Sequence, residues 1–218
     1  MTKIVTTRDG SHTIYVTELA EHYHSIHGAI TESKHIFIEA GFKQCRKKHL
    51  NILEMGFGTG LNALLTLAET QKSNRSIYYT GIEKYPLPKS ITDSLNFESF
   101  TGKAVKGMLK LIHEAAWNQD VEIRKGFILK KIESDMTQIN QQDEFDLVYF
   151  DAFAPEKQPE LWTKELFSII YKSMKRNSIL TTYSSKVTIR RNMENAGFLV
   201  EKIPGPPGKR EMTRARKA

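Results

Sequence analysis

Two patterns of hydrophobic residues take turns along the chain, one typical of strands and one typical of helices. From residue 50 onward they alternate regularly. Short apolar runs, typical of buried parallel strands, are separated by segments with the spacing of amphipathic helices. The expected strands are Leu50–Met55, Ile77–Glu83, Gly126–Ile132, Phe145–Phe150, Ser178–Tyr183 and Phe198–Ile203. The expected helices are Leu61–Glu69, Ser90–Phe100, Gly102–Ala116, one beginning near Met136, Glu160–Met174 and Thr188–Ala196. This alternation predicts an α/β fold with a doubly wound, mostly parallel sheet and helices on both faces.

The two ends of the chain are less regular. Alternating character around residues 13–17 predicts a hairpin or extended arm, and a helix is expected over Ser33–Ala40. We therefore expect an N-terminal arm (residues 1–44) that packs on a core domain (residues 45–218). The sequence PGPPG at 204–208 predicts a rigid turn, and Lys209–Arg216 could return as a final strand.

Composition is that of an ordinary globular protein, with 39% hydrophobic and 26% charged residues among 218. Cys45 is the one cysteine, which excludes an internal disulfide and fits a reducing compartment. It is expected to be partly exposed and to have no chemical role. The N-terminus lacks the apolar core of a signal peptide, and no run of 18 apolar residues exists, so we expect a cytoplasmic protein without a membrane span.

The formal net charge of +7 favours a polyanionic partner, most commonly nucleic acid, although many solvated surfaces are equally basic. The basic residues gather before the first core strand and in the last ten residues. The two groups are Lys43, Arg46, Lys47 and Lys48, and Lys209, Arg210, Arg214, Arg216 and Lys217.

A glycine-rich turn follows the first core strand in NILEMGFGTGLN, residues 51–62. Gly56, Gly58 and Gly60 let the backbone turn sharply and approach a ligand closely. The spacing differs from the G-x-G-x-x-G of dinucleotide folds and lacks the G-K-[ST] ending of a P-loop. We therefore do not expect the protein to hold its cofactor mainly by phosphate groups. An ordinary strand-to-helix turn is the alternative. With Glu54 before it, the turn resembles the first motif of class I methyltransferases, whose cofactor is S-adenosylmethionine.

Acidic residues stand at four successive strand ends, where ligands of such sheets bind. They are Glu54, Glu83, Asp135 and Asp151. Each alone could be a solvated loop acid, but together they define one rim. Glu83 could accept both hydroxyls of a ribose, Asp135 could accept from the adenine amine beside a backbone N–H of Met136, and Glu54 could face the cationic methionine end. The alternative for Glu54 is a cap of the helix turn.

The segment FDLVYFDAFAPEKQPELW (Phe145–Trp162) delivers Asp151 to this rim. Methylation of an alkyl amine needs an unprotonated nitrogen, and a fixed carboxylate can attract the ammonium, orient it and help to remove its proton. No metal is required, and the histidines show no metal-ligand spacing with cysteine. His22, His24 and His27 could cluster, but a polar surface arm is the favoured interpretation.

Three segments together suggest a specific family: EMGFGTGLN (Glu54–Asn62), FDLVYFDAFAPEKQPELW and GPPGKREMTRA (Gly205–Ala215), with ITESKHIFIEAGF (Ile30–Phe42) as a weaker fourth. They resemble the tRNA 5-methylaminomethyl-2-thiouridine methyltransferases, the methyltransferase half of the MnmC type. The resemblance runs from about Tyr23 to Ala215. It implies a class I fold, S-adenosylmethionine as cofactor, and methylation of the aminomethyl group on the wobble uridine in the tRNA anticodon loop.

The same resemblance implies a separate flavin oxidoreductase upstream, since many members are fused to one, and we expect this chain to be the stand-alone, MnmD-like half. It implies that Asp151 is catalytic. The cofactor would be held by Glu54, Gly56, Phe57, Gly58, Gly60, Asn62, Glu83, Asp135 and Met136. One departure is Ser134–Asp135, where Gly-Asp is expected, which puts the geometry of that turn in doubt.

The resemblance also gives the C-terminal segment a function. Lys209, Arg210 and Arg214 could meet tRNA phosphates, with a frayed basic tail as the alternative. Tyr183 could stack on a flipped-out uridine, or only pack the rim. Three rival functions stay open: an N-methyltransferase of a small amine or protein, a non-catalytic RNA-binding protein, and an aminopropyltransferase.

Overall fold

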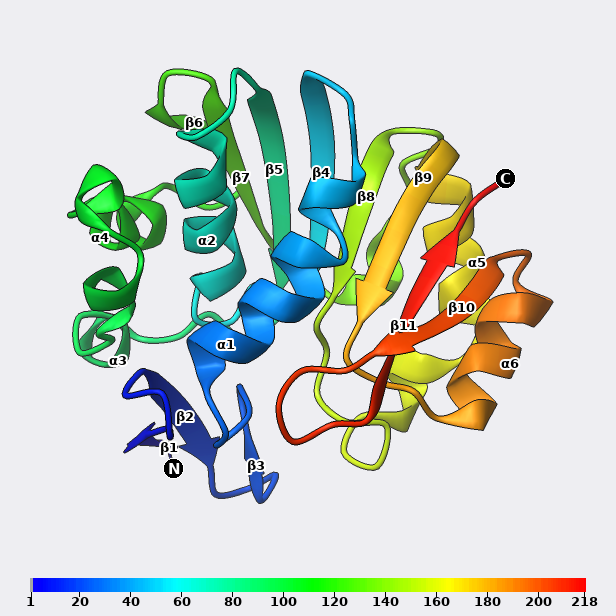
Figure 1. The fold of residues 1–218 in the computed structure, drawn as a ribbon, viewed down its shortest axis with the longest axis horizontal. Helices are drawn as coiled ribbons and strands as arrows, with labels where there is room; N and C mark the ends of the chain where they lie inside the picture. Colours follow the sequence, from blue (N-terminus) through cyan, green and yellow to red (C-terminus); the bar gives the residue numbers. More distant parts are fainter. Residues whose placement is uncertain (1) are drawn as a thin grey trace.

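A computed structural model of the protein describes residues 2–218. Its strands are β1 (Thr2–Thr6), β2 (His12–Val16), β3 (Glu21–His22), β4 (His49–Met55), β5 (Ser76–Glu83), β6 (Asp120–Arg124), β7 (Phe127–Glu133), β8 (Phe145–Phe150), β9 (Met174–Thr182), β10 (Leu199–Pro204) and β11 (Glu211–Arg216). Within this range they form a small sheet, β1-β2-β3, and a large sheet in the order β10-β11-β9-β8-β4-β5-β7-β6 (Figure 1).

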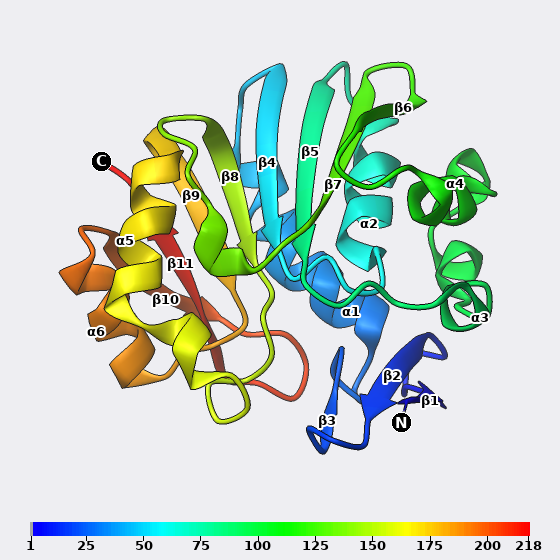
Figure 2. The ribbon, with the colours of Figure 1, turned by 180° about the vertical axis from the view of Figure 1, so that it is seen from behind.

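The helices are α1 (Ala29–Ser33), α2 (Leu61–Thr70), α3 (Lys89–Thr92), α4 (Met108–Glu114), α5 (Lys164–Ser173) and α6 (Val187–Asn195). A π-helical segment, Lys34–Glu39, continues α1, and single 3-10 turns lie at Phe42–Gln44, Phe97–Phe100, Lys103–Val105, Met136–Gln138 and Pro159–Trp162. Figures 1 and 2 show α1 and α2 on one face of the large sheet and α5 on the other, so the sheet is covered on both sides.

The centre of the large sheet is parallel and its flanks are antiparallel. β4 pairs in parallel with β5 and β8, β5 pairs with β7, and β8 pairs with β9, whereas β6, β10 and β11 run antiparallel to their neighbours. The chain leaves β4 toward β5 and returns on the other side of β4 as β8. The loops that follow β4 and β8 therefore diverge, which is where sheets of this kind leave a crevice for a ligand.

Apolar side chains explain why the sheet is buried on both faces. All six residues of β8 are buried, including Asp146, as expected for a largely apolar strand in the middle of a parallel sheet. One cluster packs α2 and the π-helical segment against β4 and β5. The other packs α5 and α6 against β8 and β9, and α5 begins where the hydroxyl of Thr163 accepts a hydrogen bond from the Leu166 N–H at 3.3 Å.

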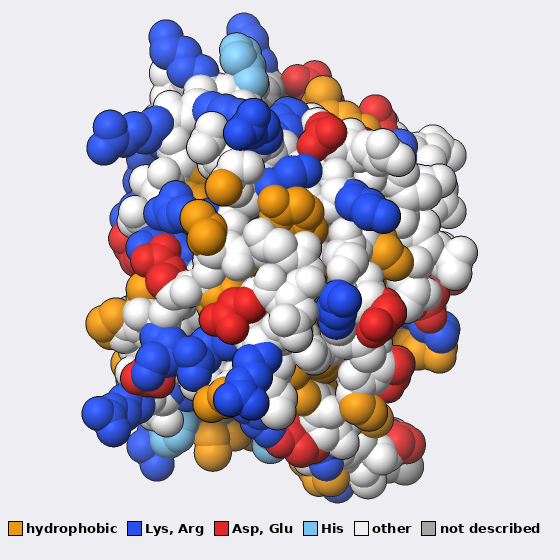
Figure 3. All heavy atoms as spheres, turned by 90° about the vertical axis from the view of Figure 1, so that its right-hand side faces the viewer, with side chains coloured by type: hydrophobic (Ala, Val, Ile, Leu, Met, Phe, Trp, Pro, Cys, Tyr) orange, Lys and Arg blue, Asp and Glu red, His pale blue; other side chains and the backbone are white. Residues whose placement is uncertain are grey.

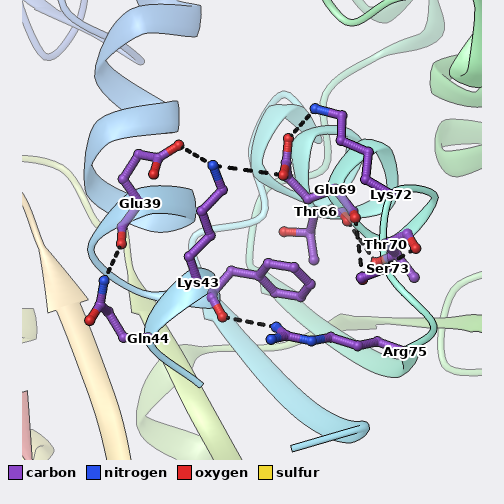
Figure 4. A network of polar contacts seen from close by, with 10 residues as sticks. Glu39, Lys43, Gln44, Thr66, Glu69, Thr70, Lys72, Ser73 and Arg75 are labelled. Carbon is purple, nitrogen blue, oxygen red and sulfur yellow. Dashed lines mark hydrogen bonds and ion pairs between the residues drawn. The ribbon is translucent and has the colours of Figure 1, made fainter. Parts of the chain in front are cut away.

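The N-terminal segment is bonded to the core at two places. Its small sheet lies beyond the carboxyl ends of the parallel strands (Figure 1). At the amino ends of the parallel strands, Lys43 forms ion pairs with Glu39 at 2.6 Å and with Glu69 of α2 at 3.9 Å (Figure 4). Arg75 donates to the Phe42 carbonyl at 3.2 Å and lies 4.9 Å from the centre of that ring. The division into an arm and a core at residue 45 stays a prediction.

The six expected core strands and the final strand are present, within four residues of the expected bounds. The long helices expected over Ser90–Phe100 and Gly102–Ala116 are wrong. The first stops at Thr92 because the Asn96 side chain is bonded to the small sheet, accepting from the His12 N–H at 2.8 Å and donating to the Gly10 carbonyl at 2.9 Å. The second is shortened by positive φ angles at Gly102 and Gly107.

Three further expectations are corrected. The helix expected to begin near Met136 is a single 3-10 turn, capped by Asp135. β6 and β1 were not expected, because both are short and polar. Cys45 is buried, not partly exposed, and burial raises the pKa of its thiol to about 11, so it stays protonated. No helix in residues 2–218 is both long and apolar enough to cross a membrane.

Candidate active site

A cavity of about 620 Å³ lies at the carboxyl edge of the parallel strands, within the size range of small-molecule and cofactor sites. Its walls come from the glycine turn, the loops after β5, β7 and β8, and the N-terminal arm. Ten of the predicted site residues line it: Gly56, Phe57, Gly58, Asn62, Glu83, Asp135, Met136, Asp151, Tyr183 and Lys209. The structure does not place Glu54, Gly60, Arg210 or Arg214 in the lining.

The glycine turn is squeezed between two other segments. Gly56 has a φ of 93°, and a Cβ there would lie 2.5 Å from the Asp151 carbonyl oxygen. Gly58 has a φ of 47°, and a Cβ there would lie 3.0 Å from the ring of Tyr23 in the arm. Gly60, with a φ of 70°, stands before the first residue of α2. Side chains at these positions would push the turn away from both neighbours, so glycine is needed for the cavity to have this shape.

Two histidines, the buried His24 and the partly buried His113, hold Thr59 in the middle of the turn. The Nε2 atom of His24 lies 2.7 Å from the Thr59 hydroxyl, and the Nε2 atom of His113 lies 3.0 Å from the Thr59 carbonyl oxygen. Burial lowers the pKa of each imidazole to about 4, so both are neutral at neutral pH. The prediction of a polar surface arm is wrong for His24, because the arm folds over the turn.

Glu83 and Asp135 occupy the rim on the β5 and β7 side. Glu83 accepts the backbone N–H groups of Gly58 at 3.0 Å and Tyr85 at 2.9 Å, and burial raises the pKa of its carboxyl. Asp135 is bonded to Lys84 at 2.8 Å and accepts the Thr137 N–H at 2.9 Å, contacts that lower its pKa to about 2.

The doubt about the turn at Ser134–Asp135 is resolved by its backbone. Asp135 is extended, with φ −68° and ψ 136°, and Ser134 is not among the residues with positive φ. Glycine is therefore not required here, and serine fits without strain.

Asn62 joins two carboxylates at the floor of the cavity. Its Nδ2 atom donates to Asp151 Oδ2 and to Glu54 Oε1, each at 2.8 Å. The Tyr79 hydroxyl donates to the other Glu54 oxygen at 2.8 Å. Glu54 is 1% exposed and lies beneath the floor rather than in the lining. Burial and the neighbouring charge of Asp151 hold the pKa of Glu54 well above its usual range.

Asp151 faces the cavity at the end of β8. Burial raises its pKa to about 7, and the hydrogen bond from Asn62 opposes that rise only in part. A carboxyl with a pKa near neutrality can both attract a cation and accept a proton from it. No group of three or more His, Cys, Asp or Glu within residues 2–218 is placed to hold a metal ion.

The C-terminal basic group spans the sheet from end to end: Lys209 and Arg210 lie at the rim, whereas Lys217, paired with Asp143 at 2.8 Å, lies at the amino end of the strands. Lys47 is paired at 2.7 Å with Asp146 near the start of β8, far from the rim. Arg214 is paired with Glu201 at 2.6 Å across β10 and β11. Lys209 enters the cavity, whereas Arg210 is exposed on the turn after β10. Figure 3 shows Lys and Arg side chains gathered near the lower edge of the face that carries β10, β11 and α6.

Sequence reasoning missed the arm's contribution to the cavity. Tyr23 lies edge-on to Phe153, with 5.0 Å between ring centres, and Glu32 lines the wall beside Lys209. Glu32 belongs to the segment Ile30–Phe42 that supported the family resemblance. That membership was the one signal that could have pointed to it.

Comparison with known proteins identifies related chains. A family described as S-adenosyl-L-methionine-dependent methyltransferase matches residues 98–218. The tRNA 5-methylaminomethyl-2-thiouridine biosynthesis bifunctional protein MnmC of Campylobacter hominis is 34% identical over 168 residues, covering 75% of this chain and 25% of the relative. The protein of that name from Leptospira interrogans is 30% identical over 205 residues, covering 87% and 31%. The chain thus spans a quarter to a third of these relatives' length.

Solved structures resemble the fold. The crystal structure of MNMC2 from Aquifex aeolicus has a TM-score of 0.84 and 27% identity, covering 100% of this chain and 70% of the other. A spermidine synthase from Thermotoga maritima has a TM-score of 0.58 at 9% identity, covering 94% and 67%, which shows a shared fold only. The predicted class I methyltransferase fold is confirmed.

The cavity fits the cofactor of the matched family, S-adenosylmethionine. The glycine turn gives it room, Glu83 is fixed at the rim, and the Asn62 Oδ1 atom is buried without a hydrogen-bond partner in residues 2–218. A buried acceptor of this kind is satisfied when a donor of a ligand reaches it. By the match over more than half of its residues and by this fit, the chain belongs to the S-adenosyl-L-methionine-dependent methyltransferases.

Proposed function

We propose that the chain methylates the primary amine of 5-aminomethyl(-2-thio)uridine at the wobble position of tRNA, giving 5-methylaminomethyl(-2-thio)uridine. The observation that carries this proposal is the likeness to the MnmC proteins and to MNMC2, which extends over most or all of the chain. The rim supports it independently, because a carboxyl with a pKa near 7 suits an alkylammonium acceptor.

We assign the cofactor contacts as follows. Gly56, Phe57 and Gly58 would line its path across the sheet, Glu83 would accept the ribose hydroxyls, and Asp135 and Met136 would flank the adenine. Asn62 presents its unpaired Oδ1 to the methionine end. Glu54 acts from beneath the floor by fixing Asn62, and Gly60 shapes the turn.

S-adenosylmethionine supplies an electrophilic methyl group on a sulfonium, with S-adenosylhomocysteine as the leaving product. Asp151 attracts the acceptor ammonium and accepts one proton from it, which frees the nitrogen lone pair. The nitrogen would then form the new C–N bond with the methyl group as the C–S bond breaks, and the product amine would carry the positive charge. The hydrogen bond from Asn62 orients the carboxylate for this step.

Substrate contacts extend from the cavity to the basic turn. The ring of Tyr183, whose hydroxyl donates to the Ala152 carbonyl at 2.9 Å, offers a face on which a flipped uridine can stack. Arg210 is exposed and can meet a phosphate, while Arg214 is engaged with Glu201. A flavin oxidoreductase acting upstream would supply the aminomethyl group, and the cytoplasm is where the tRNA is met.

The test is transfer of labelled methyl from S-adenosylmethionine to tRNA that carries the aminomethyl uridine, followed by nucleoside analysis. Label at the wobble uridine is expected. Asp151→Ala, as control, should bind the cofactor but transfer no label. Absence of label with intact cofactor binding would redirect the assignment to a methyltransferase of a small amine or a protein.

A further inference from the structure

Glu32 is an acid of the cavity that the methyl-transfer step above does not use. It lies in α1, its side chain is 12% exposed, and it lines the cavity wall. One carboxylate oxygen accepts the Ser25 N–H at 2.8 Å. The other is 2.9 Å from the Lys209 ammonium. Both oxygens are thus fixed in direction, and one of them already holds a primary ammonium.

The same ammonium lies against an aromatic face. The Lys209 Nζ atom is 4.2 Å from the ring centre of Tyr183, a distance at which a cation is attracted by the ring. Tyr183 cannot turn away freely, because its hydroxyl is bonded to the carbonyl of Ala152, the residue after Asp151. Glu32, Lys209 and Asp151 all line the same cavity, so the three groups share one compartment.

This compartment has the properties of a binding site for an alkylammonium ion. Two carboxylates supply negative charge, a tyrosine supplies an aromatic face, and the cavity walls limit the water that could screen them. The acceptor in the proposed reaction, an aminomethyl group, is a primary alkylammonium like the end of a lysine side chain. Lys209 has a flexible stem and is 36% exposed, so it can leave toward solvent.

We propose that Glu32 and Tyr183 form, with Asp151, the subsite that binds the acceptor ammonium, and that the Lys209 ammonium is a resident occupant which the substrate displaces. This inference rests on the proposed function and divides the work between two acids. Glu32 holds the cation in place, and Asp151 accepts its proton. A neutral hydroxyl or amide acceptor that displaced Lys209 would leave Glu32 without a cation, so the subsite also selects for an amine.

A purely structural ion pair is the competing explanation, since Lys209 also connects the turn after β10 to the arm. Other contacts also hold that turn against the arm, however. His35 Nε2 lies 2.8 Å from the Pro204 carbonyl oxygen, and Gly208 lies so close to His27 that a Cβ would be 2.5 Å from its ring. The turn should therefore stay docked when the charge of Lys209 is removed.

The test compares Glu32→Gln with Lys209→Met in steady-state methyl transfer to tRNA carrying the aminomethyl uridine, at saturating S-adenosylmethionine. Glu32→Gln should raise the KM for tRNA roughly ten- to a hundredfold, the effect of losing a charged hydrogen bond, with cofactor affinity unchanged. Lys209→Met should leave that KM unchanged or lower it, because the occupant is gone. Tyr183→Leu should raise it like Glu32→Gln.

A higher KM for Glu32→Gln together with an unchanged or lower KM for Lys209→Met supports the subsite, whereas equal increases in KM would show a structural ion pair and overturn it. Glu39→Gln is the matched control, because Glu39 ends the helical segment that follows α1 and pairs with Lys43 away from the cavity. Glu39→Gln should leave both the KM for tRNA and the cofactor affinity unchanged. If the unmodified protein transfers methyl but Glu32→Gln behaves like it, the subsite is wrong and the proposed function stands. If the unmodified protein transfers none to this tRNA, the proposed function and the subsite fall together.

Discussion

Two acids near the ends of β8 behave in opposite ways: Asp146 near its start is buried, and Asp151 directly after its end is partly buried. Asp146 is 4% exposed and receives Lys47 at 2.7 Å, Lys175 at 3.1 Å and the Asn51 N–H at 2.9 Å. Burial pushes its pKa up, but these donors outweigh burial and the pKa ends below its ordinary value. Asp151, at the carboxyl end, has one amide donor from Asn62, and its pKa rises to about 7.

The comparison teaches that burial alone does not decide what an acid does. Where cations and N–H groups surround it, the acid is ionised throughout the neutral range and joins strands together. Where a single amide reaches it, the acid is left ready to exchange a proton. The amino end of the sheet is therefore built for stability, and the carboxyl end for chemistry.

The largest effect that would sharpen this contrast is expected from Asp151→Asn. Methyl transfer to the aminomethyl tRNA should fall roughly 10²- to 10⁴-fold, because the proton acceptor is lost. Stability should rise at pH 8: the folded-state pKa of about 7 exceeds the ordinary 3.8, so ionisation opposes folding as pH increases between those values, by at most about 4 kcal/mol. Urea titrations at pH 8 and pH 4 measure this difference. A variant that is both active and no more stable would contradict the contrast.

Asp146→Asn should do the reverse. Removing the charge that Lys47 and Lys175 share should cost about 2 kcal/mol of unfolding free energy, discounted because both lysines are partly exposed. Methyl transfer per folded molecule should be unchanged. Thermal unfolding and an activity assay normalised to folded protein measure both. Loss of activity beyond the folded fraction would mean that the amino end is not separate from the chemistry.

The pH dependence of the reaction gives the next largest effect. Only ionised Asp151 can accept a proton, so kcat/KM should fall with decreasing pH and approach a tenfold loss for each pH unit below about 7. His24 and His113 do not share this limb, because the pKa of each is about 4. A profile of kcat/KM against pH, measured with the cofactor at saturation, distinguishes titration of Asp151 near pH 7 from titration of the two histidines near pH 4. A flat profile from pH 5 to 8 would exclude Asp151 as the proton acceptor.

The smallest effect is expected at the basic turn. Arg210→Ala should weaken tRNA binding a few-fold at moderate salt and lower the slope of log affinity against log salt by about 1, since one phosphate contact is lost. Arg214→Ala is the matched control, because that guanidinium is held by Glu201. Filter binding over a range of salt concentrations gives both slopes. Equal slopes for the two variants would remove Arg210 from the tRNA interface.

The central strands and the rim were predictable because their causes are local. Phe145–Phe150 is apolar at every position except Asp146, which predicts a buried strand, and the acid that follows it is expected at the strand's end. The glycine turn was equally predictable from the sequence. The structure shows why two of its positions need glycine: a Cβ at either one would crowd a neighbouring segment. Ten of fourteen predicted site residues line the cavity for this reason.

The features that the sequence did not predict depend on contacts between segments that are far apart in the chain, which no local sequence pattern encodes. His24 is buried because Thr59 and the glycine turn happen to lie beneath it, 35 residues away. The helix expected over Ser90–Phe100 is cut short by Asn96, whose partners are 84 and 86 residues away. Glu54 was expected in the cavity because it ends a strand, but Asn62 and Tyr79 hold it one layer below.

β11 lies between β9 and β10 in the large sheet, although it follows both in the sequence. During synthesis on the ribosome, β9 and β10 therefore emerge before the strand that will separate them. Until residues 211–216 are available, each presents an unpaired edge, and the two could pair wrongly with each other or with another chain. The turn 205–210, which carries Lys209 and Arg210, would lack its second strand at the same stage. A variant that ends before Glu211 is thus the form in which both of these strand edges stay unpaired.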